Sequence, residues 1–217
     1  MNKCIQANGH IEFTDRPCAQ GADANLSHDK KTTPHAHFPG NGIASISSIT
    51  LLAGSKELKG AVDGAGASAR FNNPGGITSD GKNLYIVDTG NQTIRKLELA
   101  TGKVTTLAGR VGKRGHKDGI GSEARFNIPQ GIAIDGDYLY VTDPASYCIR
   151  KISIGTGEVT TLAGHPGKPG SADGTGKDVT FSYPLGITAV GGNLYVTEMT
   201  YSMVVMDMAI PSQINRA

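Results

Sequence analysis

A repeat of 55 residues constrains this chain more than any other feature of its sequence. Three copies align without a gap, and the same short motifs fall at the same positions in each. The matching positions include Leu52, Leu107 and Leu162; Asp63, Asp118 and Asp173; Phe71, Phe126 and Phe181; Pro74, Pro129 and Pro184; and Gly76, Gly131 and Gly186. Chance does not produce such agreement, so the region from about Ile46 onward is a repeat array.

Each copy predicts four β-strands. In the middle copy, a short apolar strand over 131–134 is followed by an Asp-Gly turn and by a strand rich in β-formers over 139–142. Third and fourth strands are expected over 149–154 and 159–163, and apolar content falls from the first strand to the fourth. That gradient fits a propeller blade, whose inner strand lines a crowded axis while its outer strand meets water. We therefore predict an all-β fold, a β-propeller of four-stranded antiparallel blades.

Composition agrees with this fold and excludes some partners. The 217 residues include 30 glycines, roughly twice the usual share of about 7%, which suits a chain with many tight turns. The 21 basic and 19 acidic residues leave a net charge of +2, which indicates neither nucleic acid nor an acidic membrane as partner. No apolar run approaches the ~20 residues that a membrane helix needs, so no membrane span is expected.

The third copy departs from the first two at positions that change together. An arginine precedes the repeated phenylalanine and an aspartate follows the second strand; the two sets are Arg70 with Asp88 and Arg125 with Asp143. The third copy has Thr180 and Glu198 instead, and Val205 and Met206 replace the Arg-Lys pair of the third strand. The joint change predicts structural Arg–acid pairs that fix the connector between blades. Degeneration of a terminal copy is the alternative.

The repeated motifs resemble a known family. The pattern D-G-x-G-x-x-A-R-F-x-x-P-x-G-I, then L-Y-V-x-D, then I-R-K, runs from Asp118 to Lys151 and, nearly as well, from Asp63 to Lys96. It resembles the NHL-repeat family of β-propellers, over about residues 46–208. The resemblance implies the fold. It leaves the chemistry open, because the family includes scaffolds, ligand binders, RNA binders and a few lyases or lactonases.

The N-terminal residues form a separate module. The pattern K-C-x4-G-x3-F-T-D-x-P-C, from Lys3 to Cys18, resembles a small two-cysteine module of bacterial envelope proteins. The resemblance implies a Cys4–Cys18 disulfide and a periplasmic or extracellular location. Two unrelated thiols are the alternative, and a cytoplasmic location stays open because no apolar signal segment precedes Cys4. The expected organisation is a module over 1–20, a polar linker over 21–45 and blades over 46–217.

The blade count does not close a ring. By register, the array starts on an outer strand over 46–53, runs through two complete blades and stops after three strands of a third, near Met208. Propellers typically have about 4–8 blades. Three interpretations follow: a truncated fragment of a six-bladed protein, two chains that pair to complete a ring, or an open half-ring.

The repeats lack the marks of a catalytic or metal site. Propeller lyases and lactonases gather metal ligands around the axis, but the position between the repeated proline and glycine holds Gly75, Gln130 and Leu185. His116 and His165 are not equivalent in the repeat, and His28, His35 and His37 fall in the linker. The Asp-Gly pairs provide one acid per connector, so we interpret them as turns rather than calcium loops. We predict no catalytic residue, no cofactor and no metal site.

One connector is basic, with Arg110, Lys113, Arg114, His116 and Lys117. It has no interleaved aromatic residue for base stacking, and acidic residues follow it, so a solvated loop is favoured over a nucleic-acid site. Cys148, without an evident base nearby in the pattern, is interpreted as structural.

With catalytic, metal and nucleic-acid sites disfavoured, the sequence favours a binding module. Turns that emerge at the ends of a rigid scaffold carry function in many proteins. The candidate contact residues there are Asn91, Gln130, Tyr147 and Tyr183. The sequence favours a non-catalytic propeller scaffold that binds a protein, a glycan or another ligand. The alternative is a metal-dependent lyase or lactonase-like enzyme whose active site requires blades that this sequence lacks.

Overall fold

The computed structural model of the protein describes residues 2–5, 11–14, 49–199 and 203–209. The chain divides into two units, Met1–Ser48 and Ile49–Ala217. In the first unit, β1 (Asn2–Ile5) and β2 (Ile11–Thr14) form an antiparallel hairpin. Cys18 and the expected linker lie outside the described residues, so the Cys4–Cys18 disulfide stays a prediction.

The second blade shows the complete pattern of the repeat. Its four main strands form an antiparallel meander: β9 (Ile132–Asp135), β10 (Tyr138–Asp143), β11 (Cys148–Ser153) and β12 (Glu158–Gly164). These strands match the predicted ones closely. The connector adds a short strand that the sequence did not predict, β8 (Gly119–Ile120), which pairs with the outer strand β12.

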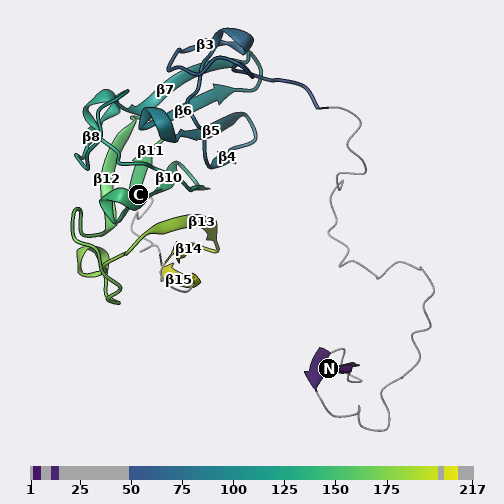
Figure 1. The fold of residues 1–217 in the computed structure, drawn as a ribbon, viewed down its shortest axis with the longest axis vertical. Helices are drawn as coiled ribbons and strands as arrows, with labels where there is room; N and C mark the ends of the chain where they lie inside the picture. Colours follow the sequence, from purple (N-terminus) through teal and green to yellow (C-terminus); the bar gives the residue numbers. More distant parts are fainter. Residues whose placement is uncertain (1, 6–10, 15–48, 200–202, 210–217) are drawn as a thin grey trace, which may run out of the picture. The chain divides into compact units, whose positions relative to one another are not determined.

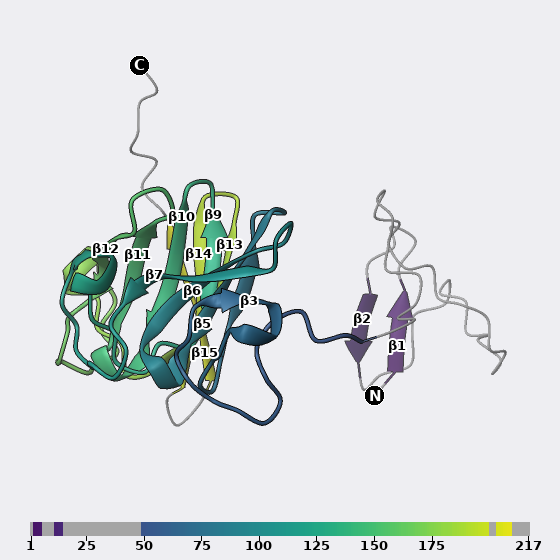
Figure 2. The same cartoon turned by 90° about the horizontal axis from the view of Figure 1, so that it is seen from above.

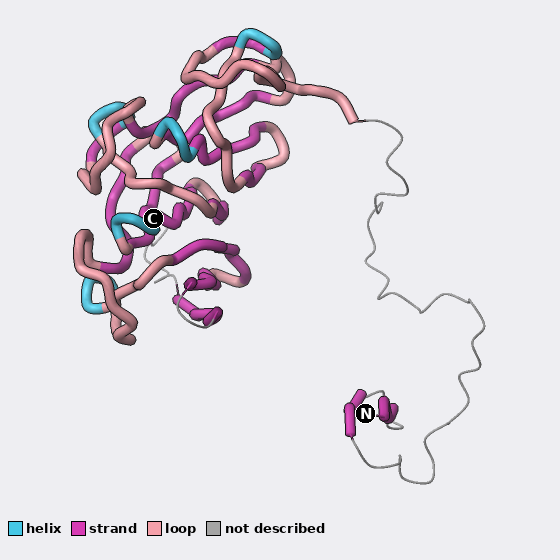
Figure 3. Tube along the Cα trace, in the orientation of Figure 1, coloured by secondary structure: helices cyan, strands magenta, loops and turns pink. Residues whose placement is uncertain are grey.

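The first blade repeats this arrangement. Its sheet has the order β3-β7-β6-β5-β4. The strands are β3 (Gly64–Ala65), β4 (Ile77–Ser79), β5 (Asn83–Asp88), β6 (Thr93–Glu98) and β7 (Lys103–Gly109). Short 3₁₀ turns lie in the loops between strands, as the tube in Figure 3 shows: η1 (Gly66–Ser68), η2 (Thr89–Asn91), η3 (Gly121–Glu123), η4 (Pro144–Ser146) and η5 (Gly176–Asp178).

The third blade has three strands among the described residues: β13 (Pro184–Val190), β14 (Asn193–Met199) and β15 (Met203–Ala209). Its strand pairing is displaced by one residue from the 55-residue period. In the first blade Ile86 lies opposite Arg95, whereas in the third blade the equivalent Val196 lies opposite Met206 rather than Val205.

The outer strand predicted over 46–53 differs from the structure. Residues 49–53 belong to no strand, and residues 46–48 lie outside the described part. An outer strand needs the third strand of its own blade as hydrogen-bonding partner. In this unit no described strand precedes residue 49, so the segment has no sheet edge of that kind to join.

The blades stack side by side and, over the described residues, do not close a ring (Figure 1). Among the inner strands, β4 contacts β9, and β9 contacts β13. The outer strands β7 and β12 lie on the other side of the array of blades. Figure 2 shows the same strands from above. No helix among the described residues is long and apolar enough to cross a membrane.

Side chains alternate between the two faces of the first blade along its second strand, β5. Tyr85 and Val87 of β5 point to the core shared with the second blade, where they meet Phe126 and Leu139. The intervening residues of β5 belong to a separate cluster on the opposite face of the first blade. Because successive side chains of a strand point to opposite faces, β5 contributes to a cluster on each face of the first blade.

Backbone contact between the inner strands explains one repeated glycine. The Gly76 N–H donates to the Gln130 carbonyl at 2.8 Å, and a Cβ at Gly76 would lie 2.7 Å from that oxygen. Thr89 Oγ1 donates to the Pro129 carbonyl at 2.7 Å beside it. Only glycine permits this approach of one blade to the next.

Candidate functional site

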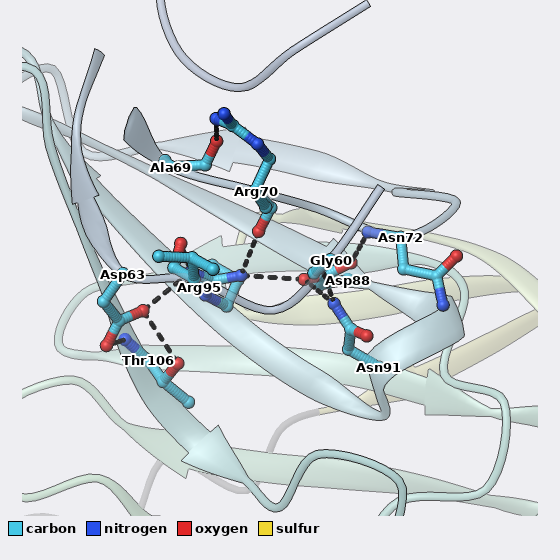
Figure 4. A network of polar contacts seen from close by, with 10 residues as sticks. Gly60, Asp63, Ala69, Arg70, Asn72, Asp88, Asn91, Arg95 and Thr106 are labelled. Atoms are coloured by element: carbon cyan, nitrogen blue, oxygen red, sulfur yellow. Dashed lines mark hydrogen bonds and ion pairs between the residues drawn. The ribbon is translucent and has the colours of Figure 1, made fainter. Parts of the chain in front are cut away.

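A buried arginine is the centre of the polar network in the first blade (Figure 4). Arg95, on β6, is 1% exposed. Its Nη1 donates to Asp88 Oδ2 at 2.8 Å and to the Arg70 carbonyl at 3.0 Å. Its Nη2 donates to Asp63 Oδ1 at 2.7 Å and to the Val62 carbonyl at 2.9 Å. One guanidinium therefore joins the third strand, the end of the second strand and the connector.

The second blade has the same arrangement around Arg150. Its Nη2 contacts Asp118 Oδ1 at 2.6 Å, and its Nη1 contacts Asp143 Oδ2 at 3.4 Å. The guanidinium also lies 5.2 Å from the centre of the Phe126 ring, as Arg95 lies 5.0 Å from that of Phe71. We call each of these arrangements an arginine lock.

The locks correct the pairing expected from the sequence. Arg70 and Arg125 were predicted to pair with Asp88 and Asp143, but the arginines that do so are Arg95 and Arg150. The Arg70 guanidinium instead donates to the carbonyls of Ala67 and Ala69, and that of Arg125 to Ser122 and Ala124. Physically, the third strand runs beside the second and brings its arginine to the buried acid, whereas the connector arginine turns back onto its own 3₁₀ turn.

Sequence reasoning missed the role of the Asp-Gly aspartates. Asp63 accepts hydrogen bonds from Arg95 and from the backbone and side chain of Thr106, and Asp118 repeats this with Arg150 and Thr161. The sequence carried no signal for this role, because the third copy keeps Asp173 although Val205 replaces the third-strand arginine.

The two locks differ at one neighbour. In the first blade, Asn91 Nδ2 donates to Asp88 Oδ2 at 2.7 Å. The equivalent residue in the second blade is Ser146, and the Arg150–Asp143 contact there is 3.4 Å long against 2.8 Å for Arg95–Asp88. Burial raises the pKa of Asp143 to about 6, although Arg150 opposes the rise. The acid of the second blade is therefore less well compensated than that of the first.

The predicted ligand-contact residues lie at the blade ends where the inner strand begins and the second strand finishes. Asn91 is 5% exposed, and its amide donates to the Gly60 carbonyl as well as to Asp88. Gln130, Tyr147 and Tyr183 are half-buried. Tyr147 has φ +59° after η4, and the Tyr183 N–H donates to Glu198. Asn91 is thus committed to the first lock, while the other three keep part of their surface in water.

A groove on the free face of the first blade was not expected from the sequence. It encloses about 330 Å³. Its apolar lining includes Leu51, Leu52, Phe71, Pro74, Ile77 and Leu84. Ile77 is 59% exposed, whereas its equivalent in the second blade, Ile132, is 6% exposed because the first blade covers it.

Among the described residues, no three His, Cys, Asp or Glu side chains gather as metal ligands would. Cys148 is fully buried, and burial raises the pKa of its thiol to about 12. His116 and His165 are exposed on connectors.

Curated relatives match part of the chain. Protein SUPPRESSOR OF QUENCHING 1, chloroplastic, from Arabidopsis thaliana is 35% identical over 145 residues, which cover 62% of this chain and 14% of that protein. NHL repeat-containing protein 2 from Gallus gallus is 43% identical over 93 residues, or 42% of this chain and 12% of that protein. The chain thus spans about an eighth of the length of these relatives. No protein-family model matches it.

Solved structures show the same fold. A protein of unknown function from Bacteroides thetaiotaomicron aligns with TM-score 0.54 and 29% identity, covering 58% of this chain and 32% of that one. An auxiliary nutrient binding protein from Bacteroides ovatus aligns with TM-score 0.51 and 23% identity, covering 61% and 36%.

The predicted fold and resemblance are both confirmed. The described strands form antiparallel blades, and curated NHL-repeat proteins match a segment of the sequence at 40–43% identity. The chain therefore contains an NHL-repeat segment, folded as blades of a β-propeller.

Proposed function

We propose that the NHL-repeat segment is a non-catalytic binding scaffold, and that the free face of its first blade is the main contact surface. The observation that carries this proposal is the exposed apolar groove over that face. Leu51, Leu52 and Ile77 are 53%, 48% and 59% exposed there. A contiguous apolar surface of this kind marks an interaction site in soluble proteins.

The structure of the second blade indicates what fits such a face. The equivalent residues there, including Phe126, Ile132 and Leu139, are buried under Tyr85 and Val87 of the neighbouring blade. The natural complement of the free face is therefore the opposite face of another blade of the same repeat. Tyr195 and Thr197, the equivalents of Tyr85 and Val87, are only half-buried on the third blade.

These two faces make a second copy of the chain the proposed occupant. The third blade of one copy would dock on the first blade of the other, and two such contacts would close a six-bladed ring. That number lies within the usual range of about 4–8 blades.

Strand pairing supports the same occupant. Leu52, Ala53 and Gly54 match the end of the outer strand β7 in sequence but join no sheet. In the described residues β15 pairs only with β14, so one of its edges is unpaired. Pairing of residues 49–54 with β15 of a second copy would complete the third blade and remove an exposed edge.

Sedimentation velocity over a range of protein concentrations tests this proposal. We expect a monomer–dimer equilibrium that Ile77→Lys shifts toward monomer, because a charge in the groove opposes burial. The matched control is Ile120→Lys, since Ile120 is 60% exposed on a connector outside the groove. A monomer at all concentrations, or equal loss of dimer in both variants, would contradict the proposal.

The cellular location is part of the proposal and rests on a separate feature. The two-cysteine motif from Lys3 to Cys18 resembles a module of bacterial envelope proteins, and disulfides persist in oxidising compartments. We expect native protein from the periplasm to lack free thiols at Cys4 and Cys18. Alkylation of both residues without prior reduction would contradict an oxidised envelope form.

A further inference from the structure

The third blade contains a buried carboxylate with one oxygen unpaired among the described residues. Glu198, near the end of β14, is 1% exposed. Its Oε1 accepts hydrogen bonds from the backbone N–H groups of Ser182 and Tyr183. Its Oε2 is buried and has no hydrogen-bond partner among the described residues. An unpaired buried acceptor costs free energy, which a donor would recover.

The unsatisfied oxygen corresponds to the one that binds arginine in the other blades. Asp88 Oδ1 accepts from the Asn72 N–H at 2.8 Å, and Asn72 is the repeat equivalent of Ser182. The other oxygen of Asp88 binds Arg95. By this correspondence, Glu198 Oε2 takes the place of the arginine-binding oxygen.

The connector of the third blade keeps the backbone geometry that supplies the remaining acceptors. The Thr180 N–H donates to the Ala172 carbonyl at 3.1 Å, as the Arg70 N–H donates to the Val62 carbonyl at 2.9 Å. The carbonyls of Ala172 and Thr180 and the carboxylate of Asp173 therefore hold the repeat positions of the remaining Arg95 acceptors. Phe181, the equivalent of the ring beneath Arg95, is fully buried.

The third blade has no basic residue at the arginine position. Strand register puts Met206 of β15 opposite Val196, as Arg95 lies opposite Ile86. The 55-residue period instead puts Val205 there, and neither residue carries a charge. The acceptors of an arginine lock are thus present without an arginine from the same strand.

We propose that the third blade binds a guanidinium group, the arginine side chain of another polypeptide, at Glu198, Asp173 and the carbonyls of Ala172 and Thr180. The first blade shows the fit, because the same acceptors take four hydrogen bonds from two guanidinium nitrogens above an aromatic ring. A planar, delocalised cation satisfies this set better than an ammonium ion, which lacks the fork of donors. Asp173 is exposed, so the site reaches the surface.

The test uses N-acetyl-L-arginine amide as the probe and N-acetyl-L-lysine amide as the matched cation, titrated into ¹⁵N-labelled protein. We expect saturable shifts of the Ser182 and Tyr183 amide signals with the arginine compound and binding at least tenfold weaker with the lysine compound. Glu198→Gln should weaken arginine binding at least tenfold. Asp178→Asn, which removes an exposed acid of the same blade, should leave it unchanged.

A second variant keeps the proposal falsifiable if Glu198→Gln does not fold. Met206→Arg should supply the guanidinium from within the chain, so it should raise the midpoint of thermal unfolding and weaken probe binding at least tenfold. Shifts that do not saturate, equal binding of both probes, or full binding in either Glu198→Gln or Met206→Arg would overturn the proposal.

Discussion

The second and third blades hold their connectors in the same backbone path with different side chains. In the second blade, Arg150 links the connector to the buried Asp143. The Gly115 N–H of the second blade donates to the Phe126 carbonyl, and the Gly170 N–H of the third blade donates to the Phe181 carbonyl although Val205 replaces the arginine there. The buried phenylalanine and the backbone bonds are therefore common to both connectors, and the arginine of the second blade adds a further attachment. The arginine compensates the buried acid and ties it to the loop.

Removal of the second-blade arginine should have the largest effect on stability. Arg150→Met should lower the free energy of unfolding by about 3–5 kcal/mol, because it leaves the fully buried Asp143 without its cation. Urea unfolding followed by circular dichroism measures the change. Arg125→Met is the matched control and should cost about 1 kcal/mol, since its guanidinium donates only to nearby carbonyls. Equal costs would mean that the lock does not depend on Arg150.

A second pair of variants compares the covered and free blade faces. Ile132→Ala should destabilise the chain by about 2–4 kcal/mol, because it opens a cavity in the core between the first two blades. Ile77→Ala at the equivalent exposed position should cost under about 1 kcal/mol in the monomer. Thermal unfolding at low protein concentration measures both effects. A larger cost at Ile77 would contradict the assignment of its face as free.

The stability contributed by Asp143 should depend on pH. The folded pKa of Asp143 is about 6, above the ordinary value of 3.8, so the folded state holds this proton more tightly than the unfolded state. The contribution of Asp143 to stability should therefore fall as pH rises from about 4 to about 6. Asp143→Asn cannot ionise, so its stability relative to the native protein should increase across that window. A relative stability that does not change with pH would contradict the raised pKa.

The smallest effect is expected at Cys148. Burial raises the pKa of its thiol to about 12, so the native protein should react with a thiol reagent at pH 8 only as fast as it unfolds. The measurement needs a Cys4→Ser, Cys18→Ser background so that Cys148 is the one reporter. Immediate reaction of the folded chain would show that the interior of the second blade is open to solvent.

Sequence alone predicted most of the fold because the repeat defines its own register. The alternation of Tyr85 and Val87 with their neighbours, and the Asp-Gly turn after residue 134, were enough to place the strands. The lock partners could not be read in the same way. Arg70 and Arg95 both vary with Asp88, and only the antiparallel pairing of β5 with β6 decides which arginine reaches the acid.

Two further features depend on neighbours that a local pattern does not contain. Residues 49–53 have the composition of an outer strand, but a strand forms only where a partner edge exists. The one-residue displacement of β15 changes the partner of Val196 without disturbing the 55-residue period.

Native-state hydrogen exchange tests the central claim most directly, since it compares the connectors within one molecule. The Arg125 N–H donates to the Lys117 carbonyl in the second blade, and the Thr180 N–H donates to the Ala172 carbonyl in the third. If the arginine lock fixes the connector, the Arg125 amide should exchange at least tenfold more slowly than the Thr180 amide, and Arg150→Met should remove that difference. Equal exchange in the native protein, or no acceleration of Arg125 in the variant, would contradict the account.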